Sequence, residues 1–424
     1  MPGRRPSLPL PDPLRGTEMP SFTHYSIVVR LPEIARRTLR ENDFTPETAA
    51  SIQQLIDEIP ASPIRQLDMP GAPDAAQWAA YLKPYEGQNW LEIPWFVAEE
   101  YFYQRILEST GYFQRGPGWR QDPYAYQKRR GLETTAAEIQ VLSERLAQLI
   151  SETKTGEQMQ AAMRQLLLVD LWGNQNDLSL WPAEPLLEPG EGQPSLQPVA
   201  LREAQEHILD NHLDAVVAYL ASLDPTHNRV DLLLDNAGFE LVCDLALADF
   251  LLSGWQAAQV VLHIKGQPVF VSDALQDDIF QTLSFLSAQP GEAAASLAAR
   301  LKNHHAAGRL ILRADPFWTS PLAMWDAPAP LLAELAYAGL LISKGDANYR
   351  RLLGDRHWAM DLSFRQVVDY LPTPVLALRT LKSEIAVGIQ AGQVPGDDSQ
   401  WMSNGHWGLV QFSQQQTAAE KSRV

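Results

Sequence analysis

The sequence predicts an α/β protein in which a helical N-terminal domain packs on a three-layer α/β/α sandwich with a mainly parallel sheet. Before residue 180, apolar residues recur at helical spacing. After residue 200, short apolar runs typical of buried strands alternate with helical segments, which is the pattern of a parallel sheet covered on both faces. Prolines and glycines between residues 181 and 199 favour a connection between these two parts.

The first part of the chain is predicted to contain an arm and a helical domain. Residues 1–20 are rich in proline and form the predicted arm, and the helical domain is predicted over residues 21–198. Thr45 before Pro46 marks a helix start, because threonine caps helices and proline suits their first turn. Apolar periodicity predicts three further helices, over residues 92–107, 134–151 and 157–171.

The second part, residues 199–424, is predicted to be the α/β/α domain. Strands are predicted over residues 230–234, 259–264, 309–312, 339–343 and 374–378. Helices are predicted over residues 201–222, 239–252 and 273–286, from about residue 347, and after the last strand. Because ligands bind beyond the carboxyl ends of the strands in open parallel sheets, the residues that follow each strand are the candidates for function.

Charge and composition exclude several classes of protein. The formal net charge of -17 repels the phosphates of nucleic acids and anionic lipids. An anionic substrate would therefore need a local cation at its site. No apolar run approaches the roughly 20 residues of a membrane helix, and the N-terminus lacks the apolar region of a signal peptide. The single cysteine, Cys243, lies in an apolar helical run, so we expect it to be buried in a soluble, cytoplasmic protein without disulfides.

Oxygen-bearing side chains follow two of the predicted strands. Asp235 and Asn236 come directly after one strand, and Asp273 follows the next. A carboxylate beside an amide oxygen suits a hard cation such as Mg²⁺ or Mn²⁺. The alternative is turn chemistry, because Asp and Asn also cap the helices that follow strands, and spacing alone favours that alternative.

Two later segments carry candidate phosphate-binding groups. Gly345 and Asp346 form a turn between a predicted strand and helix, where backbone amides can bind phosphate. Arg379 and Lys382 lie three residues apart at a predicted helix start and would share one face. Each feature has an ordinary alternative: a simple connecting turn for the first, and pairing with a surface acid such as Glu384 for the second.

Four segments, taken in order, resemble the damage-control phosphatase family. They are DNAGFELVCDLALADFLL at 235–252, HIKGQPVFVSD at 263–273, SKGDANYRRLLGD at 343–355 and RTLK at 379–382. The last is similar to the RTxK signature of the subfamily that acts on sugar phosphates. LWGNQNDLSL and NWLEIPWFVAEEYFYQRI look like the helical part of that subfamily, so the resemblance extends from about residue 20 to 390.

The resemblance implies a metal-dependent phosphatase. The divalent cation, commonly Mn²⁺ but also Co²⁺, Ni²⁺ or Mg²⁺, would be bound by Asp235, Asn236 and Asp273. The implied substrate is a small phosphorylated metabolite such as fructose 1-phosphate or a related ketose phosphate. The implied substrate-binding residues are these three together with Glu240, Gly345, Asp346, Ala347, Asn348, Tyr349 and Lys382.

The implied catalytic residues are Asp235, Asn236, Asp273 and Asp346. Either a water at the cation or a carboxylate such as Asp346 or Asp273 would attack phosphorus, and the sequence leaves both routes open.

Two alternatives remain at the level of sequence. A relative of the family has been described as a protein carboxyl methyltransferase that modifies glutamate with S-adenosylmethionine, but no glycine-rich methyltransferase loop follows the first predicted strand. The second alternative is a regulator that binds sugar phosphates in the same pocket but hydrolyses them poorly. The sequence does not fix the oligomeric state.

Overall fold

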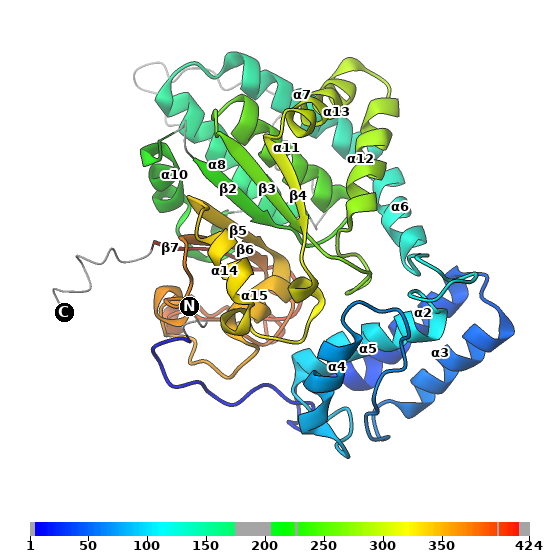
Figure 1. The fold of residues 1–424 in the computed structure, drawn as a ribbon. Helices are drawn as coiled ribbons and strands as arrows, with labels where there is room; N and C mark the ends of the chain where they lie inside the picture. Colours follow the sequence, from blue (N-terminus) through cyan, green and yellow to red (C-terminus); the bar gives the residue numbers. More distant parts are fainter. Residues whose placement is uncertain (1–4, 174–204, 225–227, 397, 415–424) are drawn as a thin grey trace.

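A computed structural model describes residues 5–173, 205–224, 228–396 and 398–414 (Figure 1). Its centre is a seven-stranded sheet in the order β1-β7-β6-β5-β2-β3-β4. The strands are β1 Ile208–Asn211, β2 Arg229–Leu233, β3 Gln259–Ile264, β4 Leu310–Ala314, β5 Leu340–Lys344, β6 Val375–Thr380 and β7 Gly408–Ser413. Within the described ranges every neighbouring pair is parallel except β6 and β7, which confirms the mainly parallel α/β prediction.

Helices surround this sheet. Those before the sheet are α1 Phe22–Tyr25, the π-helical segment η1 Ser26–Arg30, α2 Leu31–Glu41, α3 Pro46–Glu58, α4 Ala75–Leu82, α5 Trp95–Thr110, α6 Ala125–Glu133, α7 Ala136–Glu152 and α8 Gly156–Trp172. Those among the strands are α10 Leu213–Ser222, α11 Phe239–Ser253, α12 Gln276–Ala288, α13 Glu292–Ala306, α14 Ala329–Leu335, α15 Gly345–Leu353 and α16 Phe364–Val367. Short 3-10 helices are η2 Lys83–Tyr85, η5 Pro316–Thr319, η6 Met324–Asp326 and η7 Ala391–Gln393.

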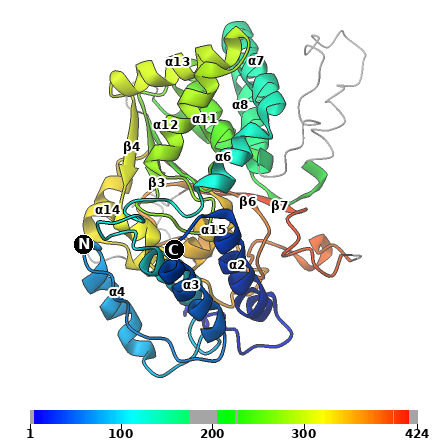
Figure 2. The same ribbon diagram turned by 90° about the vertical axis from the view of Figure 1, so that its right-hand side faces the viewer.

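The two faces of the sheet belong to two hydrophobic clusters. Alternation along β5 shows the division, because Leu340 and Ile342 join one cluster while Leu341 joins the other. The first cluster contains α7, α8 and α10 to α13, and Figures 1 and 2 show α7, α11, α12 and α13 close together at one end of the molecule. The second contains α14 to α16 and the helices α2 to α5 from the start of the chain.

Each cluster therefore joins helices from before residue 180 with residues of the sheet. The boundary between domains at residues 198 and 199 stays a prediction, because residues 174–204 lie outside the described part. The residues of the LWGNQNDLSL segment that follow Gly173 also lie outside the described part. At the start of the chain, the amide of Leu14 donates to the Asp355 carbonyl at 3.0 Å, which ties residues of the proline-rich arm to the turn after α15.

Local signals placed several elements correctly. Thr45 caps α3, and its side chain accepts a hydrogen bond from the Thr48 amide at 3.3 Å. Cys243 is buried, as expected for its apolar surroundings. No helix in the described ranges is both long and apolar enough to span a bilayer.

Three expectations are wrong. Residues 208–211 form β1 instead of helix, because they pair with β7 from the far end of the chain. No helix follows β6 among described residues 381–390, so Arg379 and Lys382 do not share a helix face. Helix α12 begins at Gln276 with Leu275 as its cap, so Asp273 lies before the helix and does not cap it.

Candidate active site

The carboxyl ends of β2, β3 and β5 bring the predicted site residues together. Asp235 and Asn236 follow β2, Asp273 follows β3, and α15 starts directly after β5. Asn236 and Asp273 pair in an antiparallel bridge, and the Ala274 amide donates to the Asp235 carbonyl at 2.8 Å. These backbone contacts join two loops that are separated by almost forty residues of sequence, and they place the three predicted metal-binding residues side by side.

Hydrogen bonds through Asn236 organise this group. Its side-chain nitrogen donates to Asp235 Oδ2 and to Glu240 Oε2, both at 2.8 Å. Its side-chain oxygen accepts a hydrogen bond from Ser272 Oγ at 2.5 Å. We refer to Asp235, Asn236, Glu240 and Asp273 as the acidic edge, because three carboxyl groups gather there around one amide.

The acidic edge has more negative than positive charge. Burial, followed by the neighbouring Glu240 and Asp273, raises the pKa of Asp235 well above its ordinary value. Burial also raises the pKa of Asp273, against the opposing effect of Lys265, whose Nζ lies 3.1 Å from Asp273 Oδ2. That same oxygen accepts no hydrogen bond in the described structure. A buried acceptor without a hydrogen bond is costly unless another group satisfies it.

The donor set fits a hard divalent cation. Two carboxylates and an amide oxygen are oxygen ligands, and Asp273 Oδ2, which lies 3.1 Å from Lys265 Nζ, is one of them. Among the described residues, no three His, Cys, Asp or Glu side chains gather in a geometry that would hold a metal ion. The fit therefore depends on the Asn236 amide, and the rest of a coordination shell would come from water or substrate oxygens, as is usual for Mg²⁺.

Gly345 lets the start of α15 approach the acidic edge closely. Its φ of +80° lies in the left-handed region, and a Cβ at this position would fall 1.9 Å from Asp235 Oδ2. No side chain fits there, so the predicted turn needs glycine both for its backbone conformation and for this contact. The first amides of α15 consequently lie next to Asp235, where the helix N-terminus favours negative charge.

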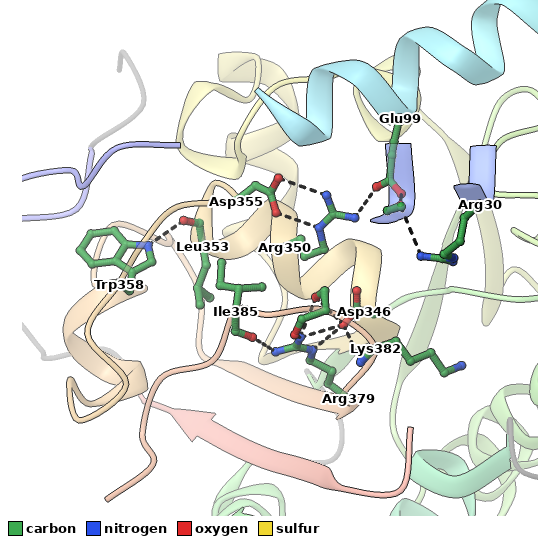
Figure 3. A network of polar contacts seen from close by, with 12 residues as sticks. Arg30, Glu99, Asp346, Arg350, Leu353, Asp355, Trp358, Arg379, Lys382 and Ile385 are labelled. Carbon is green, nitrogen blue, oxygen red and sulfur yellow. Dashed lines mark hydrogen bonds and ion pairs between the residues drawn. The ribbon is translucent and has the colours of Figure 1, made fainter. Parts of the chain in front are cut away.

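Asp346 is held by residues of the last predicted motif (Figure 3). Its Oδ1 accepts hydrogen bonds from Arg379 Nε at 2.8 Å, Ser383 Oγ at 2.9 Å and the Lys382 amide at 3.3 Å. Burial alone would raise the pKa of Asp346, but Arg379 and Arg350 lower it below the ordinary value. Arg379 lies within β6 and is fully buried, so its partner is Asp346 and not the surface acid Glu384.

The remaining predicted residues of α15 differ in exposure. Ala347 lies in the first turn and is partly exposed. Asn348 is buried, where its Nδ2 donates to the Leu234 carbonyl at 3.0 Å and its Oδ1 accepts from Lys265 Nζ at 3.1 Å. Tyr349 is fully buried, and its hydroxyl donates to Gln411 at 2.8 Å. Asn348 and Tyr349 thus anchor the helix from within the core.

Two lysines of the site are not among the site residues that the family resemblance implied. Lys265 follows β3 immediately and links Asp273 to Asn348. Lys344 ends β5, and its Nζ lies 3.0 Å from both Asp170 and Asp244 and 3.6 Å from Glu240. Both follow the rule that residues at strand ends are candidates, but their acidic partners come from distant segments.

A strained turn precedes Asp273. Phe270 and Val271 both have positive φ, at 46° and 68°, which is unfavourable for side chains other than glycine and worst for a β-branched one. The Phe270 ring packs against Tyr103 of α5, with ring centroids 5.2 Å apart. Strain of this kind persists only where the surrounding structure enforces it, and here it places Ser272 and Asp273 against Asn236.

This chain is similar to known proteins over most of its length. The family model described as "Damage-control phosphatase ARMT1-like domain" matches residues 26–395. A protein named Damage-control phosphatase ARMT1 from Danio rerio is 34% identical over 365 residues, covering 81% of this chain and 80% of the relative. The protein of the same name from Rattus norvegicus is 35% identical over 340 residues, covering 76% of this chain and 75% of the relative.

A solved structure of a DUF89 family protein from Pyrococcus horikoshii aligns with 85% of this chain and 92% of its own, with 11% identity and a TM-score of 0.45. The family match extends across the helical region, the acidic edge and α15. The chain therefore belongs to the ARMT1-like damage-control phosphatases, as the four sequence segments had indicated.

Proposed function

We propose that this protein is a cytoplasmic, metal-dependent phosphatase that hydrolyses small sugar phosphates, with ketose phosphates such as fructose 1-phosphate as the preferred class. The main support is the acidic edge, where Asp235, Asn236 and Asp273 offer oxygen ligands beside the N-terminus of α15. The family supports a phosphatase. The single buried cysteine is in keeping with a reducing compartment.

The proposed metal ligands are Asp235, Asn236 and Asp273. When bound, a divalent cation would offset phosphate charge and polarise a phosphoryl oxygen. Glu240 holds the Asn236 amide through the hydrogen bond to its nitrogen, which leaves the amide oxygen directed to Ser272 and the cation site. Lys265 keeps Asp273 next to Asn348 and so fixes the position of its carboxylate.

The start of α15 is the proposed phosphate-binding segment. Amides from Gly345 onward supply donors to phosphoryl oxygens, and Lys382 supplies a positive charge next to them. Asp346 Oδ1 already accepts three hydrogen bonds from residues 379–383. This arrangement supports a role in which Asp346 positions Lys382, and it favours water over Asp346 as the attacking group.

The experiment is phosphate release from a panel of sugar phosphates, in EDTA and then with added Mn²⁺, Co²⁺, Ni²⁺ or Mg²⁺. We expect release that depends on metal, is strongest with ketose phosphates and falls by at least about 100-fold in Asp235→Asn. The control is Asp214→Asn, which alters a carboxylate on α10 whose side chain is 87% exposed. Equal activity of the Asp235→Asn variant and the wild type would refute the site.

The same samples separate the two alternatives. Metal-independent transfer of methyl groups from S-adenosylmethionine to glutamate would identify a methyltransferase, which the names of the relatives do not favour. Saturable binding of sugar phosphates without phosphate release would identify a regulator.

A further inference from the structure

An arginine from the helical layer faces the candidate site. Arg30 is the last residue of η1, a π-helical segment of five residues between α1 and α2. Because π-helices are rare and occur frequently at functional sites, this segment is an unusual way to join two helices. A π-helical turn contains one residue more than an α-helical turn, which rotates the side chains that follow it. Arg30 lies at the end of this turn.

Arg30 has no acidic partner within the described ranges. Its Nη1 donates to Ser26 Oγ at 3.4 Å, and its guanidinium lies 5.2 Å from the Phe22 ring centroid. By contrast, Arg350, Arg351 and Arg379 each pair with a carboxylate. In a chain with a net charge of -17, an arginine left without a carboxylate is available for an anion from solution.

The contacts of Arg30 lead directly to α15. Ser26 Oγ donates to Glu99 at 3.1 Å, and Glu99 pairs with Arg350 of α15. In Figure 3 the Lys382 side chain extends toward the side of the view on which Arg30 lies, and Asp346 and Arg379 lie near the base of Lys382. The charge of Arg30 lowers the pKa of Tyr103, and the charge of Asp273 raises it, so both charges lie near this tyrosine. The Tyr103 ring packs on Phe270. Arg30 therefore lies on the side of the acidic edge that the helical layer covers.

We propose that Arg30 is a substrate-binding residue that contacts the phosphate group of the sugar phosphate from the helical layer, opposite Lys382. This inference depends on the proposed function. A phosphate monoester carries between one and two negative charges at neutral pH, and the acidic edge repels it. A guanidinium binds phosphate through two parallel hydrogen bonds, so Arg30 would supply both charge and orientation, whereas Lys382 supplies a point charge.

The test compares Arg30→Gln with Arg36→Gln, an exposed arginine of α2 that pairs with Glu33 at 3.5 Å. The measurement is kcat and KM for phosphate release from fructose 1-phosphate in the presence of Mn²⁺. We expect Arg30→Gln to raise KM by at least about ten-fold with a much smaller change in kcat, because it removes a charge-assisted contact made to the bound substrate. Arg36→Gln should match the wild type. A KM for Arg30→Gln within about two-fold of that control would overturn the inference while leaving the phosphatase proposal intact.

A second measurement decides the case in which the wild type releases no phosphate. The probe is inorganic phosphate with Mn²⁺, and the readout is the midpoint of thermal unfolding of each folded variant. We expect phosphate to raise the midpoint of the wild type and of Arg36→Gln but not that of Arg30→Gln. An equal rise in all three would overturn the role of Arg30. Arg30→Lys, which keeps the charge and loses the planar fork, should show an intermediate KM and controls for folding.

Discussion

Two regions of buried charge meet α15, and they differ in how well the charges are matched. The arginine clamp, formed by Arg350 and Arg351 with Glu99, Glu100 and Asp355, fastens α15 to α5. Arg350 contacts Asp355 at 2.8 Å and lies 3.5 Å from the centre of the Trp95 ring, and Arg351 contacts Glu100 at 2.9 Å. In the acidic edge, Lys265 pairs with Asp273 at 3.1 Å, and Glu240 and Asp273 both raise the pKa of Asp235.

This comparison indicates that the charges of the clamp have a structural role and that those of the acidic edge have a functional one. In the clamp, each arginine pairs with a carboxylate and contacts an aromatic ring, which holds α15 against α5, although Glu100 Oε2 and Arg351 Nε make no hydrogen bond in the described structure. Unmatched carboxyl groups at the acidic edge raise one another's pKa and leave the folded protein less stable, which is expected where a ligand completes the site. Variants of the two regions should therefore change stability in opposite directions.

The largest effect should come from the clamp. Arg350→Met leaves Asp355 and Glu99 buried without their partner, and we expect the free energy of unfolding to fall by about 3–5 kcal/mol. Denaturant titration measures this change. The control Arg36→Met removes an exposed ion pair and should change it by at most about 1 kcal/mol. Similar small losses in both variants would show that the clamp is not a structural element.

At the acidic edge, we expect a substitution to raise the free energy of unfolding instead of lowering it. Asp235→Asn keeps the shape of the side chain and removes one of the crowded carboxyl groups, so the free energy of unfolding in EDTA should rise by roughly 0.5–2 kcal/mol at neutral pH. The same titration measures it, with activity recorded in parallel. A less stable variant would show that the contacts of the Asp235 carboxylate outweigh its repulsion by Glu240 and Asp273.

A third effect is a dependence of the free energy of unfolding on pH, caused by Glu100 of the clamp. Burial raises the pKa of Glu100 to about 8, against the attraction of Arg351. A carboxyl group whose pKa is higher in the folded state stabilises folding at low pH, and this contribution is lost as pH rises from its unfolded value of 4.5 through about 8. Glu100 should thus lower the free energy of unfolding by up to about 1.4 kcal/mol per pH unit in this window.

The check for Glu100 is denaturant titration between the two pH values in wild type and Glu100→Gln. The variant should show a flatter dependence on pH, because its amide does not titrate. Superimposable pH profiles would mean that Arg351 keeps Glu100 ionised throughout.

Much of the candidate site follows from where the strands end. Asp235, Asn236, Asp273 and Gly345 were predicted because parallel strands deliver their carboxyl ends to one edge of a sheet, and the structure brings these four together. Arg379 shows where this reasoning stops. Its spacing from Lys382 suggested a shared helix face, but pairing with β5 and β7 keeps the segment extended and turns Arg379 toward Asp346.

The sequence by itself determined the alternation of strands and helices, the cap at Thr45 and the turn at Gly345, because periodicity, capping and turn preference are local properties. Only the tertiary structure decided that residues 208–211 form a strand, that Tyr349 is fully buried and that Arg379 pairs with Asp346. These outcomes depend on partners that are distant in the sequence, such as β7 for β1 and Gln411 for Tyr349, and no local pattern specifies which distant segment a residue will meet.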